Sequence, residues 1–286
     1  MHKIWTTSSP HAILDHSYPT SAATESGCRA VCFKNRLYCV YIDGVPGLGT
    51  VKVLHKADGS DWSEPAEVSG ITPLSDPFLF VFGEQLHVMF PTTLGSTLLL
   101  TLDEASGLFV LTRTLLMALA NTPSAAVLAG RLHLFHHVPD STNLWYCSTT
   151  DLKTWAPSVL VKADGVYAVR SPLSPLAITY QRLVHLVYKD SAGGFYLIKF
   201  DGVRQWSRAQ LLLPDDYPHT PAGAVHNGLV KLVFSQPKAD DYALHQYGYD
   251  GNVLGPVSVS TSLGATLSPA AAVQDGVLHV LYRSKP

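Results

Sequence analysis

Short runs of alternating apolar and polar residues recur along the whole chain, and the clearest of them spans residues 268–282. This stretch divides into two short strands around Asp275-Gly276, the dipeptide best suited to a type I′ turn, so it predicts a β-hairpin. The same pattern predicts hairpins at 27–40, 76–89, 122–135, 174–188 and 220–234. One strand–turn–strand unit therefore occurs six times.

The spacing of these hairpins identifies the repeat. The aliphatic residue that precedes the recurring histidine, or its equivalent, marks each copy at Leu37, Leu86, Leu132, Val184, Val230 and Leu278. Successive markers are 49, 46, 52, 46 and 48 residues apart. A period of about 40–50 residues with several strands per repeat is typical of a β-propeller. We therefore expect residues 1–286 to form one all-β domain, a six-bladed β-propeller with four-stranded antiparallel blades.

Two further strands are expected after each hairpin. In one repeat, the apolar run 195–200 leads to a turn at Asp201 and then to an outer strand that begins near Trp206. An aspartate can accept hydrogen bonds within such a turn, and the tryptophan can pack across the blade. Residues 111–120 have helical propensity, but their place in the period assigns them to an outer strand and a loop.

The beginning of the chain resembles the second half of a repeat. Residues 11–19 are similar to 209–218, and the sequence stops at Pro286, just after the second strand of the last hairpin. We therefore expect residues 4–7 and 12–14 to supply the outer two strands of the last blade. Such closure would protect the sheet edges.

Composition excludes some classes of partner. Hydrophobic residues make up 47% of the chain and charged residues 15%, which fits a fold made mostly of buried strands. The net charge of −2 disfavours nucleic-acid binding, which needs a basic face. No apolar run reaches the ~18 residues of a membrane span, so we expect no membrane insertion.

The cysteines and the first residues bear on the cellular compartment. The first ten residues lack the basic start and the apolar core of a secretory signal. The four cysteines fall within predicted strands, match no zinc pattern, and are expected to be buried reduced thiols: Cys28, Cys32, Cys39 and Cys147. We expect a cytoplasmic protein, with unconventional secretion as an open alternative.

A histidine recurs in the second strand of four hairpins. These side chains occupy equivalent positions on different blades, too far apart to share one metal ion: His87, His133, His185 and His279. His136 and His137 are adjacent in a strand, so they point to opposite faces. We expect a structural role for these histidines, no metal site and no cofactor.

The hairpin pattern Pro-x-Ala-x-x-x-x-Gly-x-Leu-His-x-Phe/Tyr, followed by Asn-Leu-Trp-Tyr at 143–146 and a Trp-led fourth strand, resembles the blades of β-propeller lectins. Within that group, the blade pattern most resembles that of the fungal fucose- and N-acetylglucosamine-binding lectins and the bacterial lectins related to them. The resemblance implies non-catalytic carbohydrate binding, with glycans or glycoconjugates as partners. The Arg, Glu and aromatic set of fucose pockets does not recur in this sequence. Residues 149–155 also resemble the structural Asp-box hairpin of sialidases and the Asp-Leu-x-x-Trp hairpin of propeller glycosidases.

Candidate ligand-binding residues lie in two sets of loops expected on one face of the propeller. Loops after the second strands contribute Asp43, Asp140, Asp190 and Asp240, and loops from an outer strand to the next blade contribute Tyr18, Tyr167, Arg170, Tyr217 and His219. A tyrosine ring can stack on a sugar, and a carboxylate can accept hydrogen bonds from hydroxyls, which predicts several related shallow pockets. The alternative is that these are ordinary turn residues. We expect Tyr217→Ala to weaken saccharide binding without lowering the melting temperature.

Two other functions stay open. A glycosidase needs two carboxylates about 5–10 Å apart, and Asp76 is the one acid at the start of an inner strand. A sialidase-like site needs three converging arginines, whereas the sequence offers Arg29 and Arg170 at the top. The small inner-strand residues predict a narrow, largely apolar channel. We therefore expect a lectin that is a monomer or a small homo-oligomer, with a glycan-processing enzyme and a protein-interaction propeller as alternatives.

Overall fold

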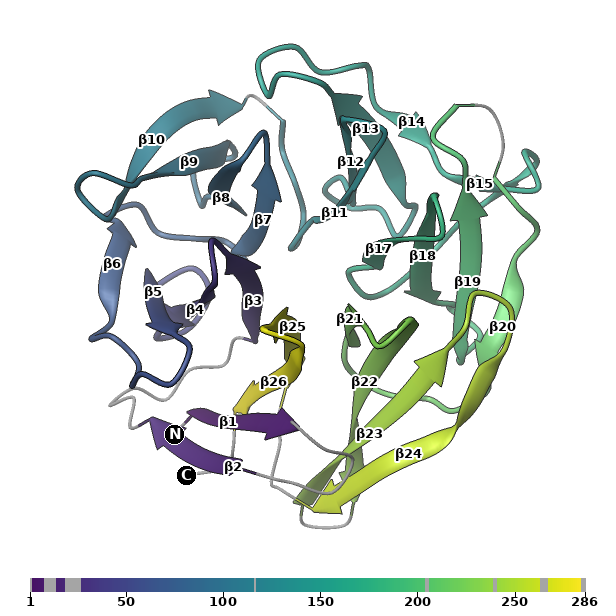
Figure 1. The fold of residues 1–286 in the computed structure, drawn as a ribbon. Helices are drawn as coiled ribbons and strands as arrows, with labels where there is room; N and C mark the ends of the chain where they lie inside the picture. The colour runs from purple at the N-terminus through teal and green to yellow at the C-terminus, as the bar shows by residue number, and fades with distance from the viewer. Residues whose placement is uncertain are drawn as a thin grey trace.

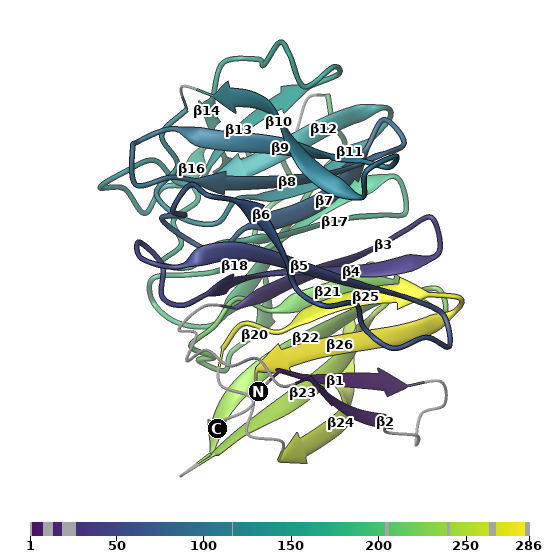
Figure 2. The same ribbon diagram turned by 90° about the vertical axis from the view of Figure 1, so that its left-hand side faces the viewer.

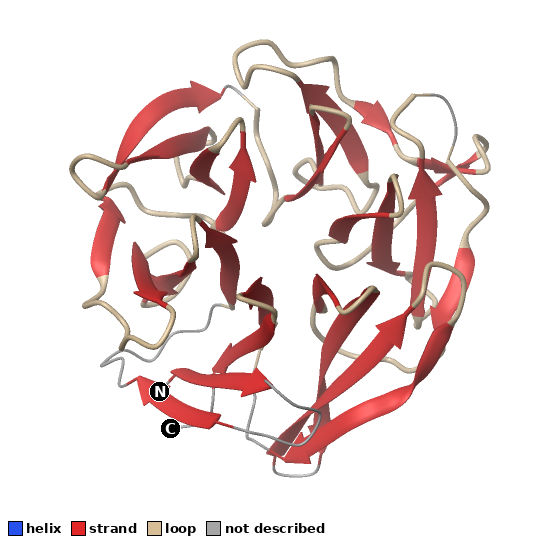
Figure 3. Cartoon of the chain, viewed as in Figure 1, coloured by secondary structure: helices blue, strands red, loops and turns tan. Residues whose placement is uncertain are grey.

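The computed structural model describes residues 2–7, 14–18, 27–115, 117–203, 206–238, 241–262 and 267–283. These residues form β-strands and connecting loops (Figure 3). Within these ranges, no helix is long and apolar enough to cross a membrane.

Six four-stranded antiparallel sheets are formed by the described residues, and they are arranged in a ring around a central axis (Figure 1). Five of these sheets each use four strands that are consecutive in the chain. From the inner to the outer strand they are β3 (Cys28–Phe33), β4 (Arg36–Asp43), β5 (Thr50–Ala57) and β6 (Ala66–Ser69); β7 (Phe78–Phe82), β8 (Gln85–Pro91), β9 (Thr97–Asp103) and β10 (Leu108–Leu115); β11 (Ser124–Leu128), β12 (Arg131–His136), β13 (Trp145–Thr149) and β14 (Val159–Leu160); β17 (Leu176–Tyr180), β18 (Leu183–Lys189), β19 (Phe195–Phe200) and β20 (Gln210–Leu213); β21 (Ala222–His226), β22 (Leu229–Lys238), β23 (Asp241–Tyr249) and β24 (Leu254–Ser262). The predicted all-β propeller with four-stranded antiparallel blades is confirmed.

The remaining sheet combines the two ends of the chain. Its strand order is β2 (Leu14–Tyr18), β1 (His2–Thr7), β26 (Val277–Arg283) and β25 (Ala270–Gln274). Strand β1 pairs antiparallel with β26, with Ile4 opposite Leu281 (Figure 1). The prediction that the N-terminal strands complete the last sheet is therefore confirmed. Of the predicted second strand at 12–14, Leu14 begins β2, and residues 12 and 13 lie outside the described residues.

Each inner hairpin is closed by two residues with positive φ, as a type I′ turn requires. Asp275 and Gly276 have φ of 48° and 76°, which confirms the turn predicted for the last hairpin. Gln181 and Arg182 adopt the same conformation although neither is a glycine, with φ of 49° and 61°. The blade twist therefore imposes this turn even where the residue type does not favour it.

The second strand of each hairpin is buried on both faces, because it lies between neighbouring blades. The aliphatic marker of every repeat is buried, as are the histidines that follow four of the markers. The blades are stacked around the axis with their flat faces against one another (Figure 2). Consequently the strict alternation of apolar and polar residues breaks down in these strands.

The long connection at 161–172 contains a two-stranded hairpin of β15 (Lys162–Ala163) and β16 (Tyr167–Ala168). Residues 111–115 belong to the outer strand β10 and 117–120 to a loop, as predicted.

Candidate functional site

A cavity of about 350 Å³ lies beside the β15–β16 hairpin, where the connection from one blade meets the strands of the next. We call it the Tyr188 pocket. Its lining includes tyrosines, arginines, aspartates and a serine from three chain segments: Asp164, Tyr167, Arg170, Tyr188, Asp190, Ser191, Tyr196 and Arg208. The pocket therefore combines aromatic rings with charges of both signs.

Backbone hydrogen bonds fix the segment that forms one wall of the pocket. Val161 N donates to Leu144 O, Leu144 N donates to Val169 O, and Val169 N donates to Val161 O, each at 2.9 Å. Asp164 N donates to Ser207 O at 3.1 Å and so joins the hairpin to the neighbouring blade. Val161 and Val169 are buried in the core between the two blades. This wall is therefore held in place before any ligand arrives, which favours binding.

Two tyrosines form the aromatic part of the pocket. Tyr188 of β18 lies directly opposite Tyr196 of β19, and their rings are stacked with centroids 6.0 Å apart and an angle of 26°. Burial, followed by the charge of Asp190 and by Tyr196, raises the pKa of the Tyr188 phenol to about 12. This phenol therefore stays protonated at neutral pH and can donate a hydrogen bond.

The charged residues of the pocket are exposed or half-buried. Arg170, Arg208 and Asp164 are exposed, whereas Asp190 is half-buried. Asp190 Oδ1 accepts a hydrogen bond from Ala192 N at 2.8 Å, which fixes the loop after β18. Within the described part of the chain, neither arginine forms an ion pair. Both guanidinium groups are therefore available to hydroxyl or carboxylate oxygens of a ligand.

Three of the predicted site residues meet in this pocket: Tyr167, Arg170 and Asp190. Tyr167 is 73% exposed on β16, so its ring face is open to solvent. Arg170 forms an isolated β-bridge with Asn143. This bridge uses backbone atoms and does not involve the Arg170 side chain. The sequence had indicated these residues separately, and the fold brings them together.

Tyr217 does not have the predicted role of an exposed stacking ring. It is only 1% exposed and packs against Phe195 and Phe234. Its hydroxyl lies 3.0 Å from His245 Nδ1 and 2.9 Å from Tyr247 Oη. The expectation that Tyr217→Ala would leave the melting temperature unchanged is therefore wrong, because this ring is part of the core.

The other predicted residues lie apart from the Tyr188 pocket. His219 is half-buried, and its pKa is lowered by burial and then by the charge of Lys189. Asp43 ends β4, and Asp140 is an exposed turn residue with φ of 60°. Tyr18 ends β2, but its side chain is not described, and Asp240 lies outside the described residues.

The sequence analysis missed Tyr188, Tyr196 and Arg208, and also Asp164 and Ser191 of the same lining. The first two could have been found, because a turn at 190–194 places Lys189 opposite Phe195 and hence Tyr188 opposite Tyr196. Arg208 carried no such signal. It reaches the pocket because the turn before β20 is hydrogen-bonded to the β15–β16 hairpin.

A second cavity, of about 380 Å³, occupies the axis of the ring. Its lining consists mainly of small and aliphatic inner-strand residues, with Arg29 as a charged exception. Asp76, the acid that an axial enzyme would need, accepts a hydrogen bond from Gly27 N at 3.1 Å and is not part of this lining. Arg29 donates to Cys28 O and lies in a different cavity from Arg170. An axial glycosidase or sialidase site is therefore not assembled from these predicted residues.

The recurring histidines are buried within their blades. His87 Nε2 lies 3.1 Å from Phe82 O and its ring stacks on Phe80, while His133 stacks on Tyr146. Burial lowers the pKa of His133, His185 and His279 to about 4. No group of three or more potential metal ligands was found among the residues that the structure describes. The histidines therefore act as packed, neutral side chains.

Comparison with known proteins adds information on the fold. No protein-family model and no curated protein sequence matches the chain. A fucose-specific lectin from Aleuria aurantia is similar in structure, with a TM-score of 0.65 and 10% identity over 91% of this chain and 88% of the lectin.

Two enzymes share the fold as well. An α-L-arabinofuranosidase from Clostridium thermocellum has a TM-score of 0.56 and 12% identity over 82% of this chain and 95% of the enzyme. A sialidase from Trypanosoma rangeli has a TM-score of 0.61 and 10% identity over 94% of this chain and 56% of the sialidase. The chain thus has the fold seen in β-propeller lectins and in glycosidase and sialidase propellers, as its blade pattern had suggested.

Proposed function

We propose that the protein is a non-catalytic carbohydrate-binding lectin and that the Tyr188 pocket is its saccharide site. The main support is the meeting of Tyr167, Arg170 and Asp190 with the stacked pair of Tyr188 and Tyr196 in one cavity. Aromatic faces suit the C–H face of a sugar, and charged hydrogen-bonding groups suit its hydroxyls. The partners would be glycans or glycoconjugates.

The number of blades belongs to the same proposal. We count the sheet formed by both chain ends as a sixth blade. The Aleuria aurantia lectin, which recognises fucose, is likewise described as a six-bladed β-propeller. Fucosides are therefore the first saccharides to test. Several occupied pockets would give avidity for glycan-coated surfaces. The stoichiometry of binding decides how many pockets are used.

A glycan array identifies the saccharide, and titration calorimetry with the best hit then tests the site. Tyr167→Ala and Arg170→Gln should each weaken binding about tenfold or more, because each removes about 1.4 kcal/mol or more of contact energy. Val166→Ala is the matched control, since Val166 is the exposed neighbour of Tyr167 and does not line the pocket. Unchanged affinity in both pocket variants would contradict the proposal.

Glycoside hydrolysis is the second candidate, because Asp164 and Asp190 both line the pocket and two structural neighbours are glycosidases. A general acid is usually kept protonated by burial, whereas Asp164 is exposed, so binding without turnover fits better. Chromogenic glycosides of the sugar selected on the array separate the two functions. Product release that is lost in Asp164→Asn, with binding retained, would establish the enzyme.

A further inference from the structure

A third cavity, of about 410 Å³, lies between the first two blades that follow the N-terminal strands. We call it the Phe33 pocket. Lys34 lies in the β3–β4 turn and Arg36 begins β4, while Glu104 lies in the β9–β10 turn and Glu64 in the segment before β6. These connections lie at the opposite ends of the strands from the β18–β19 loop of the Tyr188 pocket. The Phe33 pocket is therefore separate from the proposed saccharide site.

The floor of this pocket is the open end of the hydrophobic core between the two blades. Phe33, Tyr38, Val53, Leu102 and Phe109 belong to that core and retain 7–9% exposure where they line the pocket. Other members of the same core are 0% exposed: Val40, Val51, Leu86, Val88 and Phe90. Apolar surface thus faces the cavity from both blades, and covering it would be favourable.

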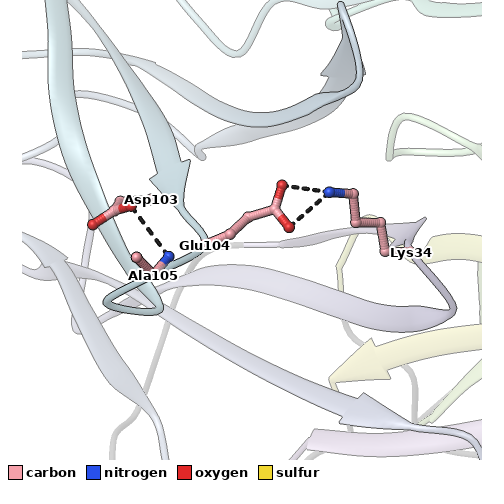
Figure 4. Close-up of polar contacts among 4 residues, drawn as sticks. All are labelled: Lys34, Asp103, Glu104 and Ala105. Atoms are coloured by element: carbon pink, nitrogen blue, oxygen red, sulfur yellow. Dashed lines mark hydrogen bonds and ion pairs between the residues drawn. The ribbon is translucent and has the colours of Figure 1, made fainter.

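The rim carries one closed ion pair. Lys34 Nζ lies 2.5 and 2.7 Å from the two carboxylate oxygens of Glu104, so that the pair joins the turns of neighbouring blades (Figure 4). The same ammonium group lies 5.3 Å from the centroid of the Phe33 ring. Lys34 and Glu104 neutralise each other, and the pair contributes little stability at such an exposed position.

Arg36 is the other cation of the rim and has a different environment. It is exposed and forms no ion pair within the described residues. Its neighbour His55 is stacked on Tyr38, with centroids 5.3 Å apart. Burial, followed by the charge of Arg36, lowers the pKa of His55, which favours its neutral form at neutral pH. Arg36 therefore presents an unused guanidinium fork beside an apolar floor.

The two inter-blade pockets differ in the chemistry that they offer. The aromatic residues of the Tyr188 pocket are tyrosines, which suit a polar sugar, whereas the Phe33 pocket adds two phenylalanines, Val53 and Leu102. Glu64 is the acidic residue of the rim that lacks an ion pair among the described residues, and it would repel an anion. We propose that the Phe33 pocket is a second ligand site for a small amphipathic carboxylate, with its apolar ring on Phe33 and Phe109 and its carboxylate on Arg36.

Titration with indole-3-acetate tests this proposal, and indole-3-acetamide is the uncharged control with the same ring. Calorimetry measures affinity, and methyl NMR of Val53 and Leu102 locates the ligand. We expect saturable binding of the carboxylate, at least tenfold weaker binding of the amide, and at least tenfold weaker carboxylate binding in Arg36→Gln. Glu64→Gln should bind the carboxylate at least as well as the parent protein.

Arg131→Gln is the matched control, because Arg131 occupies the corresponding position after the β11–β12 turn and lies outside the pocket. Ala66→Trp is a second blocking variant, since Ala66 is exposed, lines the pocket and can be enlarged without entering the core. It should abolish binding at an unchanged melting temperature. The absence of saturable binding at millimolar concentrations, or equal binding by parent and Arg36→Gln, would overturn the proposal. Saccharide binding at the Tyr188 pocket should persist in all of these variants.

Discussion

Two tyrosines in equivalent loops have opposite environments. This contrast shows that the position of a residue in the repeat does not determine the burial of its side chain. Tyr167 is 73% exposed beside the Tyr188 pocket, whereas Tyr217 is 1% exposed within the core of the next interface. Both stand in a connection from an outer strand to the next blade. Their different burial depends on the β15–β16 hairpin, which carries Tyr167 outward and has no counterpart at Tyr217. The sequence therefore placed both tyrosines in loops between blades but did not predict which ring faces solvent.

Replacing Tyr217 should show its structural role. We expect Tyr217→Ala to lower the free energy of unfolding by about 3–5 kcal/mol, as loss of a buried aromatic ring does. Tyr217→Phe keeps the ring and should cost less, about 1–2 kcal/mol, for the contacts of the hydroxyl with His245 and Tyr247. Urea unfolding measures both changes. Tyr167→Ala is the exposed control and should change stability by less than about 0.5 kcal/mol. Equal costs at both tyrosines would contradict the assigned burial.

At the scale of elements, the hairpins were predictable because their turn chemistry is local. Asp275-Gly276 and Asn227-Gly228 are favourable type I′ dipeptides, and both have positive φ in the structure. The β15–β16 hairpin was missed, and of the outer strand predicted at 12–14 only Leu14 is described, as the first residue of β2. The missed hairpin does carry a local signal, because its turn contains Asp164-Gly165 and both residues have positive φ. Outer strands are also shorter in places, such as the two-residue β14, which leaves little pattern to detect.

Ala129 offers a test of the turn requirement. This exposed residue has φ of 50° in the β11–β12 turn, a conformation that costs a non-glycine residue about 1–2 kcal/mol. We expect Ala129→Asn to raise the free energy of unfolding by about 1 kcal/mol, because asparagine tolerates the left-handed region. Ala192→Asn is the matched control in an exposed turn without positive φ and should bring no gain. Thermal unfolding of the two variants provides the comparison, and equal melting temperatures would count against strain at Ala129.

At the scale of the whole molecule, the period of the repeat predicted the ring because every blade needs two neighbours to bury its faces. The same arrangement encloses one histidine in each of four inner hairpins. The candidate site was less accessible, since the Tyr188 pocket depends on contacts between blades that no local pattern encodes. Tyr196 and Arg208 are examples, because they come from different parts of a blade and meet at the β15–β16 hairpin.

Stability should fall steeply in mild acid. The pKa of His133, His136, His185 and His279 is lowered by burial to about 4 in the folded protein, against an ordinary value near 6.5 when unfolded. Above pH 6.5 these histidines are neutral in both the folded and the unfolded protein, so they do not lower the free energy of unfolding. As the pH falls from about 6.5 to about 4, the unfolded state binds protons that the folded state does not, and stability is lost. At pH 5 each histidine then lowers the free energy of unfolding by about 2 kcal/mol.

Urea unfolding at several pH values between 7 and 5 measures this loss. His133→Tyr provides the matched variant, because Tyr38 occupies the equivalent position in the first hairpin. The slope of its free energy of unfolding against pH should correspond to about one fewer proton bound on unfolding. A free energy of unfolding that does not change between pH 7 and pH 5 would contradict the neutral state of these buried rings.

The sheet shared by both ends of the chain also constrains how the protein is made. Strand β1 is synthesised before the intervening blades, and its partner β26 only after them. The last sheet therefore cannot form until β26 has emerged. The edge of β1 that faces β26 stays unpaired while the intervening blades fold, although its other edge can pair with β2. Chaperone binding to nascent chains should consequently persist until β26 has emerged, and ribosome profiling of chaperone-bound chains would detect it.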